Sequence, residues 1–547
     1  MKELSVLQKD FVEALNYPSK KYRALALEPI SVPRDPLITS YPQLPGKKIS
    51  VKNFFYSLYF TAFDVRDYGP SILKFMKIFN SLSVKKVYLE TYRDGYHADT
   101  RLLSSAKKSL EKEGFEVSGA VTPTHFSSKT SFNEFSSATG CYSDPAALKK
   151  LKAEFERAAA VFNEIIIDDW FFTVCRCPSC EKARGKKTKE EFRSKLILDA
   201  SKKYIIAPAK KINKKVKLIL KLPQWFGNYI NNGYDIEKLA PLFDGISAGT
   251  EARDPLKTPF LPVHGSLLIN YLRSIAPGKV TSAWFDPYMC TKETYCEQAY
   301  QSLLGGAKEL ILFSAGILAQ PLVLPLAAEL ASQSEKFDRF SSFKNIFSVP
   351  VLRDPSAYDN EHFEQYLLSA GIPAYMRPPG KISEKIVVIT AQSCPPSGIA
   401  KLFASLIKEN KEIIITAQAA LSAGRQFKIK KLKTPVKVKA IKYSGREEEP
   451  QGGLYITYDM QGLKNYVLAN NAYPVIAFRK IKKTGVWILN LPHTKDEILS
   501  HTNAGLPAGH RVIFRLKGFT EALRSIFKGY ANVNLYNKIK TFYKHTW

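Results

Sequence analysis

Acidic residues at the ends of predicted strands are the residues of this chain best suited to chemistry. Asp168 and Asp169 directly follow the apolar run Ile165–Ile167, and Asp286 ends a later strand in the stretch A-W-F-D-P-Y. Glu251 follows another strand in A-G-T-E-A-R-D. Carboxyl groups brought together from separate strands can protonate a leaving oxygen and stabilise or attack a positively charged carbon. These four acids are therefore candidate catalytic residues for cleavage of a glycosidic bond.

Charged and aromatic residues accompany these acids at the strand ends. Aromatic rings can stack on the apolar face of a sugar, and charged side chains can bind its hydroxyl groups or a substrate carboxylate. The candidate substrate-binding residues are Glu90, Arg93, Trp170, Lys221, Trp225, Arg253 and Trp284. Alternatively, a single strand-end acid can simply cap a loop or form a salt bridge. Only one of Asp168 and Asp169 can face a substrate if the strand stays regular, because successive side chains alternate.

Three cysteines follow the acid pair in the spacing C-x-C-x-x-C, at Cys175, Cys177 and Cys180. Thiolates packed this densely on a loop are typical of metal ligands. A closed tetrahedral zinc site needs a fourth ligand, and Cys141, in T-G-C-Y-S-D-P, is the predicted one. Four thiolates leave no open coordination position, so the predicted zinc is structural. The alternative is four unrelated buried cysteines.

Strands and helices that alternate from residue 51 onward must position these residues. Eight such units within about 270 residues predict a TIM barrel, in which chemistry is located at the carboxyl ends of the strands. The alternative is an open doubly wound sheet, but no G-x-G-x-x-G follows the first strand, so a dinucleotide-binding fold is unsupported. The predicted strands are Phe54–Phe60, Val87–Glu90, Val117–Thr122, Ile165–Asp169, Val216–Leu222, Phe243–Thr250, Val280–Asp286 and Leu310–Ser314.

Composition predicts four parts in the chain of 547 residues. Residues 1–48 are rich in proline and are predicted to form an extended arm. Residues 49–340 form the barrel, and residues 341–425 form a smaller, parallel α/β domain. Residues 426–547 contain alternating strands separated by turns, which are typical of a small antiparallel β-sandwich.

The chain is strongly basic, with 80 Lys and Arg against 50 Asp and Glu, for a net charge of +30. The lysines are scattered in pairs, so we expect a solvated surface and no nucleic-acid partner; the charge could also favour an acidic sugar such as a uronate or a sulfated sugar. The sequence shows no signal peptide and no apolar stretch near the ~18 residues of a membrane span. Seven cysteines, four of them in a metal pattern, fit a reducing cytoplasm.

The order of these domains, together with the cysteine pattern, resembles glycoside hydrolase family 42, the β-galactosidases. That family carries a C-x-C-x-x-C motif after its fourth strand and a further cysteine upstream, as Cys175, Cys177, Cys180 and Cys141 do here. The resemblance implies that residues 341–425 form a flavodoxin-like module of the trimerisation type. It also implies a homo-oligomer, a dimer or a trimer.

The chain departs from that family at the catalytic positions. The family's fourth strand ends I-D-N-E with an acid/base glutamate, whereas this chain reads I-D-D-W and places Trp170 there. The family's nucleophile on the seventh strand corresponds to Asp286. The chain therefore resembles a divergent branch, and β-galactosidase activity is not carried over. By fold-level analogy, α-galactosidase-type barrels use an aspartate ending the fourth strand and an acid of the sixth, roles that Asp169 and Glu251 would suit.

These observations predict a retaining glycoside hydrolase that acts on an oligosaccharide or glycoside. Asp169 is the preferred nucleophile, Asp168 and Asp286 are the alternatives, and Glu251 is the preferred acid/base. Carboxyl groups about 5–5.5 Å apart would indicate retention, and roughly 6.5–9.5 Å would indicate inversion. The alternative, suggested by Trp170, is a catalytically inactive carbohydrate-binding or scaffold protein with a glycosidase fold.

Overall fold

The computed structural model describes residues 49–126, 140–253, 260–342, 346–357, 363–450, 453–460, 462–494 and 516–530. The arm predicted over residues 1–48 lies outside the described residues. Contacts divide the chain into two compact units. The first contains the strands before residue 314; the second contains those after residue 348, together with residues 225–228 and 260–277.

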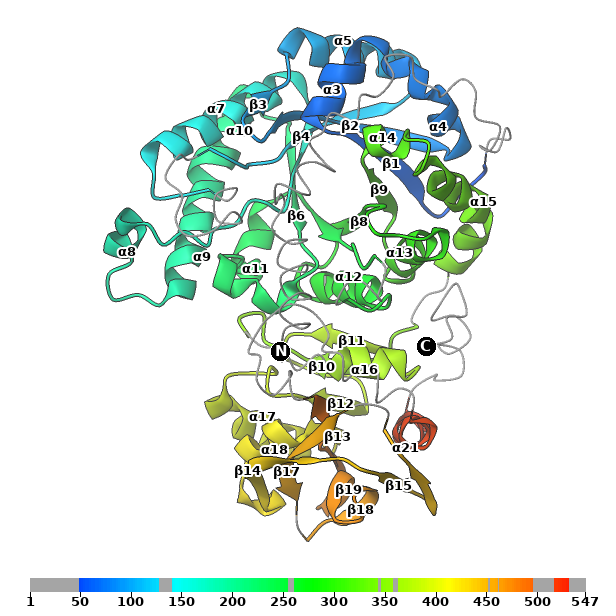
Figure 1. Ribbon diagram of the computed structural model, residues 1–547. Helices are drawn as coiled ribbons and strands as arrows, with labels where there is room; N and C mark the ends of the chain where they lie inside the picture. Colours follow the sequence, from blue (N-terminus) through cyan, green and yellow to red (C-terminus); the bar gives the residue numbers. More distant parts are fainter. Residues whose placement is uncertain are drawn as a thin grey trace. The chain divides into compact units, whose positions relative to one another are not determined.

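Eight parallel strands of the first unit close into a barrel, so the predicted TIM barrel is confirmed (Figure 1). Strand β1 pairs with both β2 and β9, which closes the ring. A two-residue strand, β3 (Tyr96–His97), folds back antiparallel on the end of β2. The barrel strands are β1 (Phe55–Phe60), β2 (Val84–Arg93), β4 (Glu116–Val121), β5 (Glu164–Ile167), β6 (Lys217–Leu222), β7 (Gly245–Gly249), β8 (Val280–Phe285) and β9 (Glu309–Phe313).

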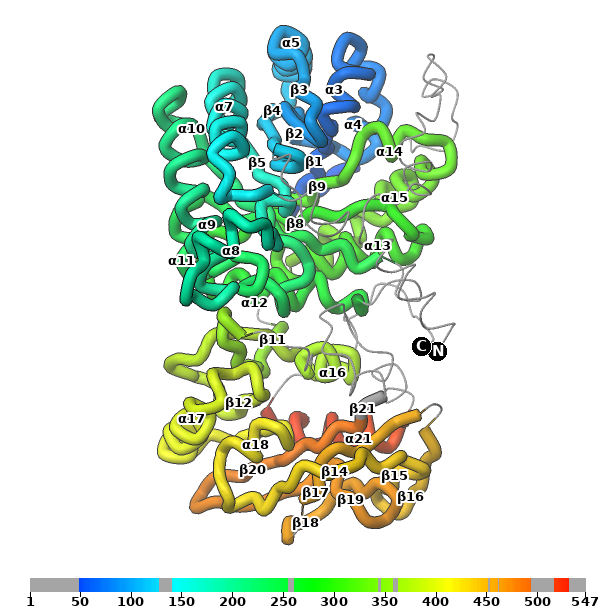
Figure 2. Tube along the Cα trace, turned by 60° about the vertical axis from the view of Figure 1, so that its left-hand side comes forward, coloured from blue at the N-terminus to red at the C-terminus, as the bar shows by residue number. Residues whose placement is uncertain are grey.

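Helices flank the barrel strands and connect them in sequence (Figure 2). Side chains cap the starts of several of them. Asp144 accepts a hydrogen bond from the backbone of Ala146 at the start of α7 (Pro145–Val161), and Thr188 forms a capping box with Glu191 at the start of α9 (Lys189–Ala200). The principal helices are α3 (Ala62–Tyr68), α5 (Thr100–Lys112), α7 (Pro145–Val161), α9 (Lys189–Ala200), α13 (Lys292–Leu304) and α15 (Leu324–Ser341). Among the described helices, none is long and apolar enough to cross a membrane.

Large side chains fill the inside of the barrel. The ring of Trp284 lies 4.4 Å from that of Tyr59 and 5.4 Å from that of Phe313, measured between centroids. These rings form the apolar floor beneath the carboxyl ends of the strands, so the barrel is a packed core and not a channel. The buried residues of this cluster are Tyr59, Tyr88, Ala120, Ile166, Trp284 and Ile311.

The second unit is built on one mixed sheet that crosses the domain boundary predicted at residue 426. Strand β20 (Thr484–Leu489) pairs in parallel with β13 (Glu412–Thr416), and the strands beyond β20 are antiparallel. The run Ile413–Ile415 is fully buried and needs a neighbour on its second edge, which β20 supplies. The strand order is β11 (Ala374–Arg377), β10 (Val349–Leu352), β12 (Ile386–Ile389), β13, β20, β19 (Tyr473–Ile481), β18 (Lys464–Ala469), β15 (Ile441–Tyr443) and β16 (Arg446–Glu448). A separate antiparallel sheet contains β14 (Ile429–Lys437), β17 (Leu454–Met460) and β21 (His493–Thr494).

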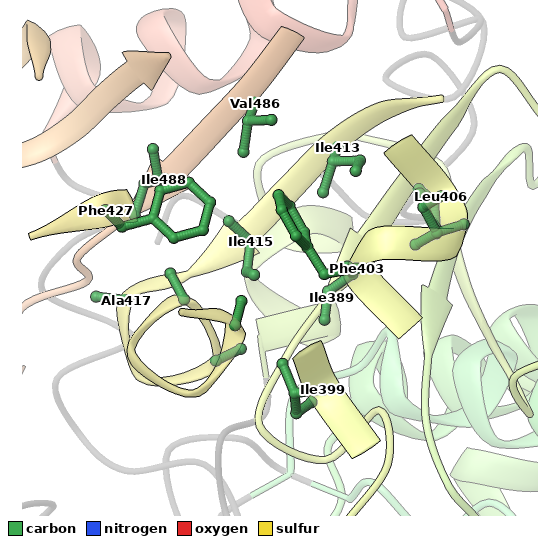
Figure 3. Close-up of a cluster of buried hydrophobic side chains, with 14 of the residues drawn as sticks. Ile389, Ile399, Phe403, Leu406, Ile413, Ile415, Ala417, Phe427, Val486 and Ile488 are labelled. Atoms are coloured by element: carbon green, nitrogen blue, oxygen red, sulfur yellow. The ribbon is translucent and has the colours of Figure 1, made fainter. Parts of the chain in front are cut away.

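One apolar core joins the two parts of this mixed sheet (Figure 3). Phe403, on helix α17 (Pro396–Lys408), meets Phe427 edge to face at 5.3 Å between ring centroids. The cluster also contains Ile415 of β13 and Ile488 of β20. Residues before and after position 426 therefore share a single core, because the apolar faces of β13 and β20 are buried by the same helices.

Candidate active site

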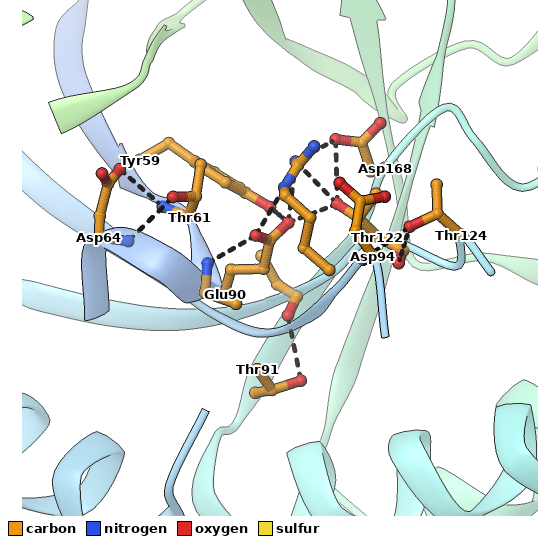
Figure 4. A network of polar contacts seen from close by, with 12 residues as sticks. Tyr59, Thr61, Asp64, Glu90, Thr91, Asp94, Thr122, Thr124 and Asp168 are labelled. Carbon is orange, nitrogen blue, oxygen red and sulfur yellow. Dashed lines mark hydrogen bonds and ion pairs between the residues drawn. The ribbon is translucent and has the colours of Figure 1, made fainter. Parts of the chain in front are cut away.

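Glu90 and Arg93, near the end of β2, are the centre of a buried polar network (Figure 4). Arg93 Nε lies 2.8 Å from Glu90 Oε2, and Arg93 Nη2 lies 3.0 Å from Oε1. Glu90 also accepts hydrogen bonds from the Tyr59 hydroxyl at 2.5 Å, from the backbone of Ala62 at 2.7 Å and from the Thr122 hydroxyl. Both oxygens of the fully buried Glu90 are thus occupied, so it fixes Arg93 and has no oxygen left for a substrate.

Asp168 and Asp169 leave β5 as neighbouring carboxyl groups that share a hydrogen bond. Asp168 Oδ2 lies 3.2 Å from Arg93 Nη2. Although burial raises the pKa of Asp168, the Lys221 ammonium and the hydrogen bond from Asp169 outweigh burial and lower the pKa to about 2. Burial raises the pKa of Asp169 well above its ordinary value, and the charge of Asp168 adds to this effect while Lys221 opposes it. In the unliganded site, Asp169 therefore carries the proton of the pair.

Lys221, near the end of β6, lies between two of the predicted catalytic acids. Its Nζ is 3.0 Å from Asp169 Oδ2 and 2.9 Å from Glu251 Oε1, and it sits 4.2 Å from the centroid of the Trp284 ring. Burial lowers the pKa of Lys221, but Asp169 and Glu251 together raise it above its ordinary value. Because both acidic oxygens lie within 3.0 Å of one nitrogen, they are at most about 6 Å apart. The structure brings Asp169 and Glu251 together around a single ammonium group.

The second oxygen of Glu251 is buried, and it has no hydrogen-bond partner among the residues that the structure describes. Burial is the largest cause that raises the pKa of Glu251, and the nearby Asp286 raises it further, while Lys221 lowers it. A Cβ at Gly249, at the end of β7, would lie 2.7 Å from Glu251 Oε2, so a larger residue there would displace this carboxyl group. Glu251 is thus able to hold a proton on an oxygen that is not otherwise bonded.

Arg253 and Asp286 form a two-pronged ion pair beside this acid. Arg253 Nε and Nη2 lie 2.9 and 2.6 Å from the two carboxylate oxygens of Asp286. The backbone N–H of Tyr288 donates to Asp286 Oδ1 at 3.1 Å. Burial lowers the pKa of Arg253, but the charge and hydrogen bond of Asp286 outweigh burial and raise it. Asp286, the alternative nucleophile, is therefore held by a guanidinium on both oxygens.

The three predicted tryptophans occupy different positions. Trp284 is 2% exposed and forms part of the floor, with the Lys221 ammonium over its ring. Trp170 is partly exposed and stacks on Phe172, with ring centroids 6.1 Å apart. Trp225 is partly exposed in the loop after β6 and belongs to the second unit.

Several residues of the site were missed in the sequence analysis. The Thr122 hydroxyl lies 3.3 Å from Asp168 Oδ2, and the Tyr234 hydroxyl donates to the backbone oxygen of Asp169 at 2.8 Å. Arg93 also lies over the ring of Phe313, 5.3 Å from its centroid. The position of Thr122 at the end of a predicted strand was an available signal, whereas nothing in the sequence pointed to Tyr234.

The four predicted metal-binding cysteines converge, and their sulfur atoms all lie within 4.8 Å of one another. Cys141 Sγ is 3.7 Å from Cys177 Sγ and 3.6 Å from Cys180 Sγ. A disulfide would require about 2.05 Å. Four buried sulfur atoms in this arrangement could hold a metal ion. The ion would join the loop between β4 and α7 to the loop that follows β5.

Hydrogen bonds connect this cluster to the acid pair through a short segment. The backbone of Phe171 donates to the Asp168 carbonyl at 3.2 Å, and the Thr173 hydroxyl donates to the Gly140 carbonyl at 3.0 Å. The backbone of Cys175 in turn donates to the Thr173 hydroxyl at 3.2 Å. The position of the acid pair therefore depends on the loop that the cysteines hold.

Comparisons with known proteins agree with this geometry. Residues 46–349 match the family model described as a probable glycosyl hydrolase catalytic domain. An uncharacterised protein of Saccharolobus solfataricus is 29% identical over 350 residues, and this alignment spans 58% of either chain. The chain thus spans somewhat over half the length of that curated relative.

Solved glycosidases share the fold at low sequence identity. The β-galactosidase from Rahnella sp. R3 has a TM-score of 0.59 at 12% identity, with 89% of this chain and 90% of that chain covered. A catalytic mutant of Gan42B, a glycoside hydrolase family 42 β-galactosidase from G. stearothermophilus, has a TM-score of 0.58 at 10% identity, with 87% and 88% covered. An exo-β-1,4-mannosidase from Opitutaceae bacterium strain TAV5 has a TM-score of 0.53 at 10% identity, with 91% and 98% covered. At these identities the likeness concerns the fold.

Proposed function

Because the chain belongs to the family of probable glycosyl hydrolase catalytic domains, we propose that it hydrolyses a glycoside or oligosaccharide with Asp169 and Glu251 as its catalytic pair. The observation that supports this pair is the Lys221 ammonium between them, which limits Asp169 Oδ2 and Glu251 Oε1 to a separation of at most about 6 Å. Retaining glycosidases hold their carboxyl groups about 5–5.5 Å apart, and inverting ones roughly 6.5–9.5 Å. The upper bound for this pair of oxygens is compatible with a retaining mechanism, which we propose.

In this mechanism Glu251 is the general acid. Burial raises its pKa and so favours the protonated form, which donates the proton to the glycosidic oxygen as the bond to the anomeric carbon breaks. Asp169 attacks that carbon and forms a covalent glycosyl-enzyme. Glu251, now a carboxylate, takes a proton from water, whose oxygen displaces Asp169 and restores the enzyme.

Asp168 and Asp286 remain the alternative nucleophiles, and exposure favours Asp169. The side chain of Asp169 is 15% exposed, against 5% for each of the other two. Asp168 also lies against Arg93, and Asp286 is bound on both oxygens by Arg253. Asp169 carries the proton of the pair before substrate binds, so its attack requires that this proton first pass to Asp168 or to water.

Activity against a panel of 4-nitrophenyl glycosides tests this proposal. We expect at least one α- or β-glycoside to release nitrophenol. Proton NMR should show that the sugar product formed first has the same anomeric configuration as the substrate. A first-formed product of opposite configuration would contradict retention. Binding of sugars without hydrolysis of any glycoside would instead favour the catalytically inactive carbohydrate-binding protein, to which Trp170 points.

The charge of Lys221 predicts how activity depends on pH. In Lys221→Met, the pKa values of Asp169 and Glu251 both rise, because the ammonium that lowers them is lost. Asp169 then becomes a carboxylate only at a higher pH. Glu251 stays protonated up to a higher pH. The bell-shaped profile of kcat/KM should move to higher pH by about one unit. Lys221→Arg keeps the charge and should keep the wild-type profile; an unshifted profile in Lys221→Met would contradict the role.

We also propose that the four cysteines bind zinc. Bonds of about 2.3 Å in a tetrahedral zinc site place neighbouring sulfur atoms about 3.8 Å apart. The distances from Cys141 Sγ to the sulfur atoms of Cys177 and Cys180, 3.7 and 3.6 Å, agree with this edge. With four thiolate ligands the ion would have no open position, so it would hold loops and take no part in hydrolysis. The expected cytoplasmic location and homo-oligomeric state stay predictions.

A further inference from the structure

Each cation that the described strand ends bring to the site is already paired with acids of the protein. Arg93 contacts Glu90 and Asp168, and Lys221 contacts Asp169 and Glu251. Arg253 contacts both oxygens of Asp286. The side chains of these three cations are only 13%, 4% and 22% exposed. A substrate carboxylate or sulfate would therefore have to displace a carboxylate that the protein already provides.

The acids of the site leave none of its positive charge uncompensated. Three cationic groups face five carboxyl groups, and all five lie within hydrogen-bonding distance of one of the three. With Asp169 and Glu251 protonated, the other three carboxylates balance the three cations. In a site with little water, an added negative charge without a cation of its own is costly, because it loses its hydration. The positive net charge of the whole chain would attract an acidic sugar from a distance, yet the site offers such a sugar no uncompensated cation.

Asp286 is the acid best placed to control this selectivity. It occupies Arg253 with both oxygens, which is the arrangement that a substrate carboxylate would otherwise adopt. Its own position is fixed, because Tyr288 donates a backbone hydrogen bond to Oδ1 and Gln298 Nε2 donates to the Asp286 carbonyl at 2.9 Å. The carboxylate of Asp286 therefore cannot move aside without losing several contacts.

We propose that this site selects a glycone without negative charge, a neutral sugar ring that donates hydroxyl hydrogen bonds, and that Asp286 excludes uronic and sulfated sugars by occupying Arg253. This inference rests on the proposed function in one respect, that the bound ring is the sugar whose glycosidic bond is cleaved. It concerns binding, however, and can be tested without hydrolysis. Glu251 Oε2, buried and without a partner among the described residues, is an oxygen that can exchange a hydrogen bond with such a sugar.

Binding of matched ligands tests the inference. The ligands are the methyl glycosides of glucose and galactose, the corresponding methyl uronates, and the cationic iminosugars of the same two configurations, titrated calorimetrically into the full-length protein. For the configuration that binds, we expect the uronate to bind at least about 10-fold more weakly than the neutral glycoside, and the iminosugar to bind more tightly. A uronate that binds as tightly as its neutral partner would overturn the proposal, and so would a failure of all six ligands to bind.

Substitution of Asp286 gives the sharper result. Asp286→Asn frees Arg253, so the ratio of uronate to neutral affinity should rise about 10-fold, and the gain should shrink at high salt. The double variant Arg253→Met, Asp286→Asn removes the freed cation and should lose this gain; it also serves if the single variant is unstable. Asp67→Asn, which removes an exposed acid paired with Arg66, is the matched control and should leave the ratio unchanged. An unchanged ratio in Asp286→Asn would overturn the proposal.

These outcomes separate the inference from the proposed function. A protein that binds neutral sugars selectively but cleaves no glycoside would contradict the proposed function and support the inference. A protein that cleaves uronides in preference to neutral glycosides would support the proposed function and overturn the inference.

Discussion

Asp169→Asn and Glu251→Gln should each lower kcat by at least about 10³-fold on the best substrate of the glycoside panel. Each substitution keeps the shape of the side chain but removes either the nucleophilic carboxylate or the transferable proton. Lys221 lies within 3.0 Å of both acids, and an amide oxygen can still accept its hydrogen bond. The loss of activity should therefore appear in kcat. Circular dichroism should show that both variants keep the folded structure.

Added azide should distinguish the two roles. In Asp169→Asn, azide can attack the anomeric carbon directly, so the glycosyl azide formed should have the configuration opposite to that of the substrate. In Glu251→Gln the covalent intermediate still forms from a substrate with a good leaving group, and azide should then give a product of retained configuration. The opposite assignment of configurations would exchange the two roles.

Matched variants complete this test. Asp168→Asn should lower kcat less than Asp169→Asn if Asp169 is the nucleophile, because Asp168 acts through its hydrogen bond to Asp169. Glu111→Gln removes an acid that is largely exposed on α5 and should leave kcat unchanged. If Asp168→Asn, rather than Asp169→Asn, formed a glycosyl azide of configuration opposite to that of the substrate, Asp168 would be the nucleophile.

The sequence was most informative where chemistry and fold depend on neighbours along the chain. The apolar run Ile165–Ile167 predicted a buried strand, and the acids that follow it could be placed at the carboxyl end of a barrel on that basis alone. The spacing of Cys175, Cys177 and Cys180 similarly predicted a cluster that the structure brings together with Cys141. Both signals are carried by residues that are neighbours in the sequence, so they can be recognised without knowledge of the tertiary structure.

Pairings between distant segments could not be predicted in this way. Nothing in the sequence showed that Arg93 would reach Asp168 beyond another strand, or that Lys221 would lie between two acids of other strands. Each of these pairs depends on which strands are neighbours in the barrel and on which way each side chain faces. The same limit applies to the second unit. There the pairing of β20 with β13 joins segments about 70 residues apart, and a period-two pattern could not show it.

Charge shows the same difference between local and global information. A net charge of +30 left an acidic sugar open as a substrate, beside the expected solvated surface, yet the strand ends place five acids around three cations. Long-range attraction falls off within about 10 Å in salt, whereas a buried pair is screened far less. The chemistry of the site is therefore determined by a few buried groups, and the composition of the whole chain is a poor guide to it.

Removal of the metal should lower both the stability and the activity of the protein. The protein purified without chelators should contain about one zinc per chain by mass spectrometry. Cys177→Ser, or treatment with 1,10-phenanthroline, should lower the melting temperature by about 10 °C, because a ligand bound only by the folded state contributes several kcal/mol and a domain of this size loses about 2–4 °C per kcal/mol. Cys394→Ser, outside the cluster, is the matched control and should leave the melting temperature and metal content nearly unchanged.

Activity should fall with the metal because the cysteines and the acid pair are parts of one segment. Only five residues separate Asp169 from Cys175, and Thr173 bonds both to Gly140 and to the backbone of Cys175. Loosening this loop should displace Asp169 from Lys221, so kcat should fall while the pH profile of the remaining activity keeps its shape. Four freely titratable thiols in the native protein, with a melting temperature that a chelator does not change, would show instead that these are buried cysteines without a metal.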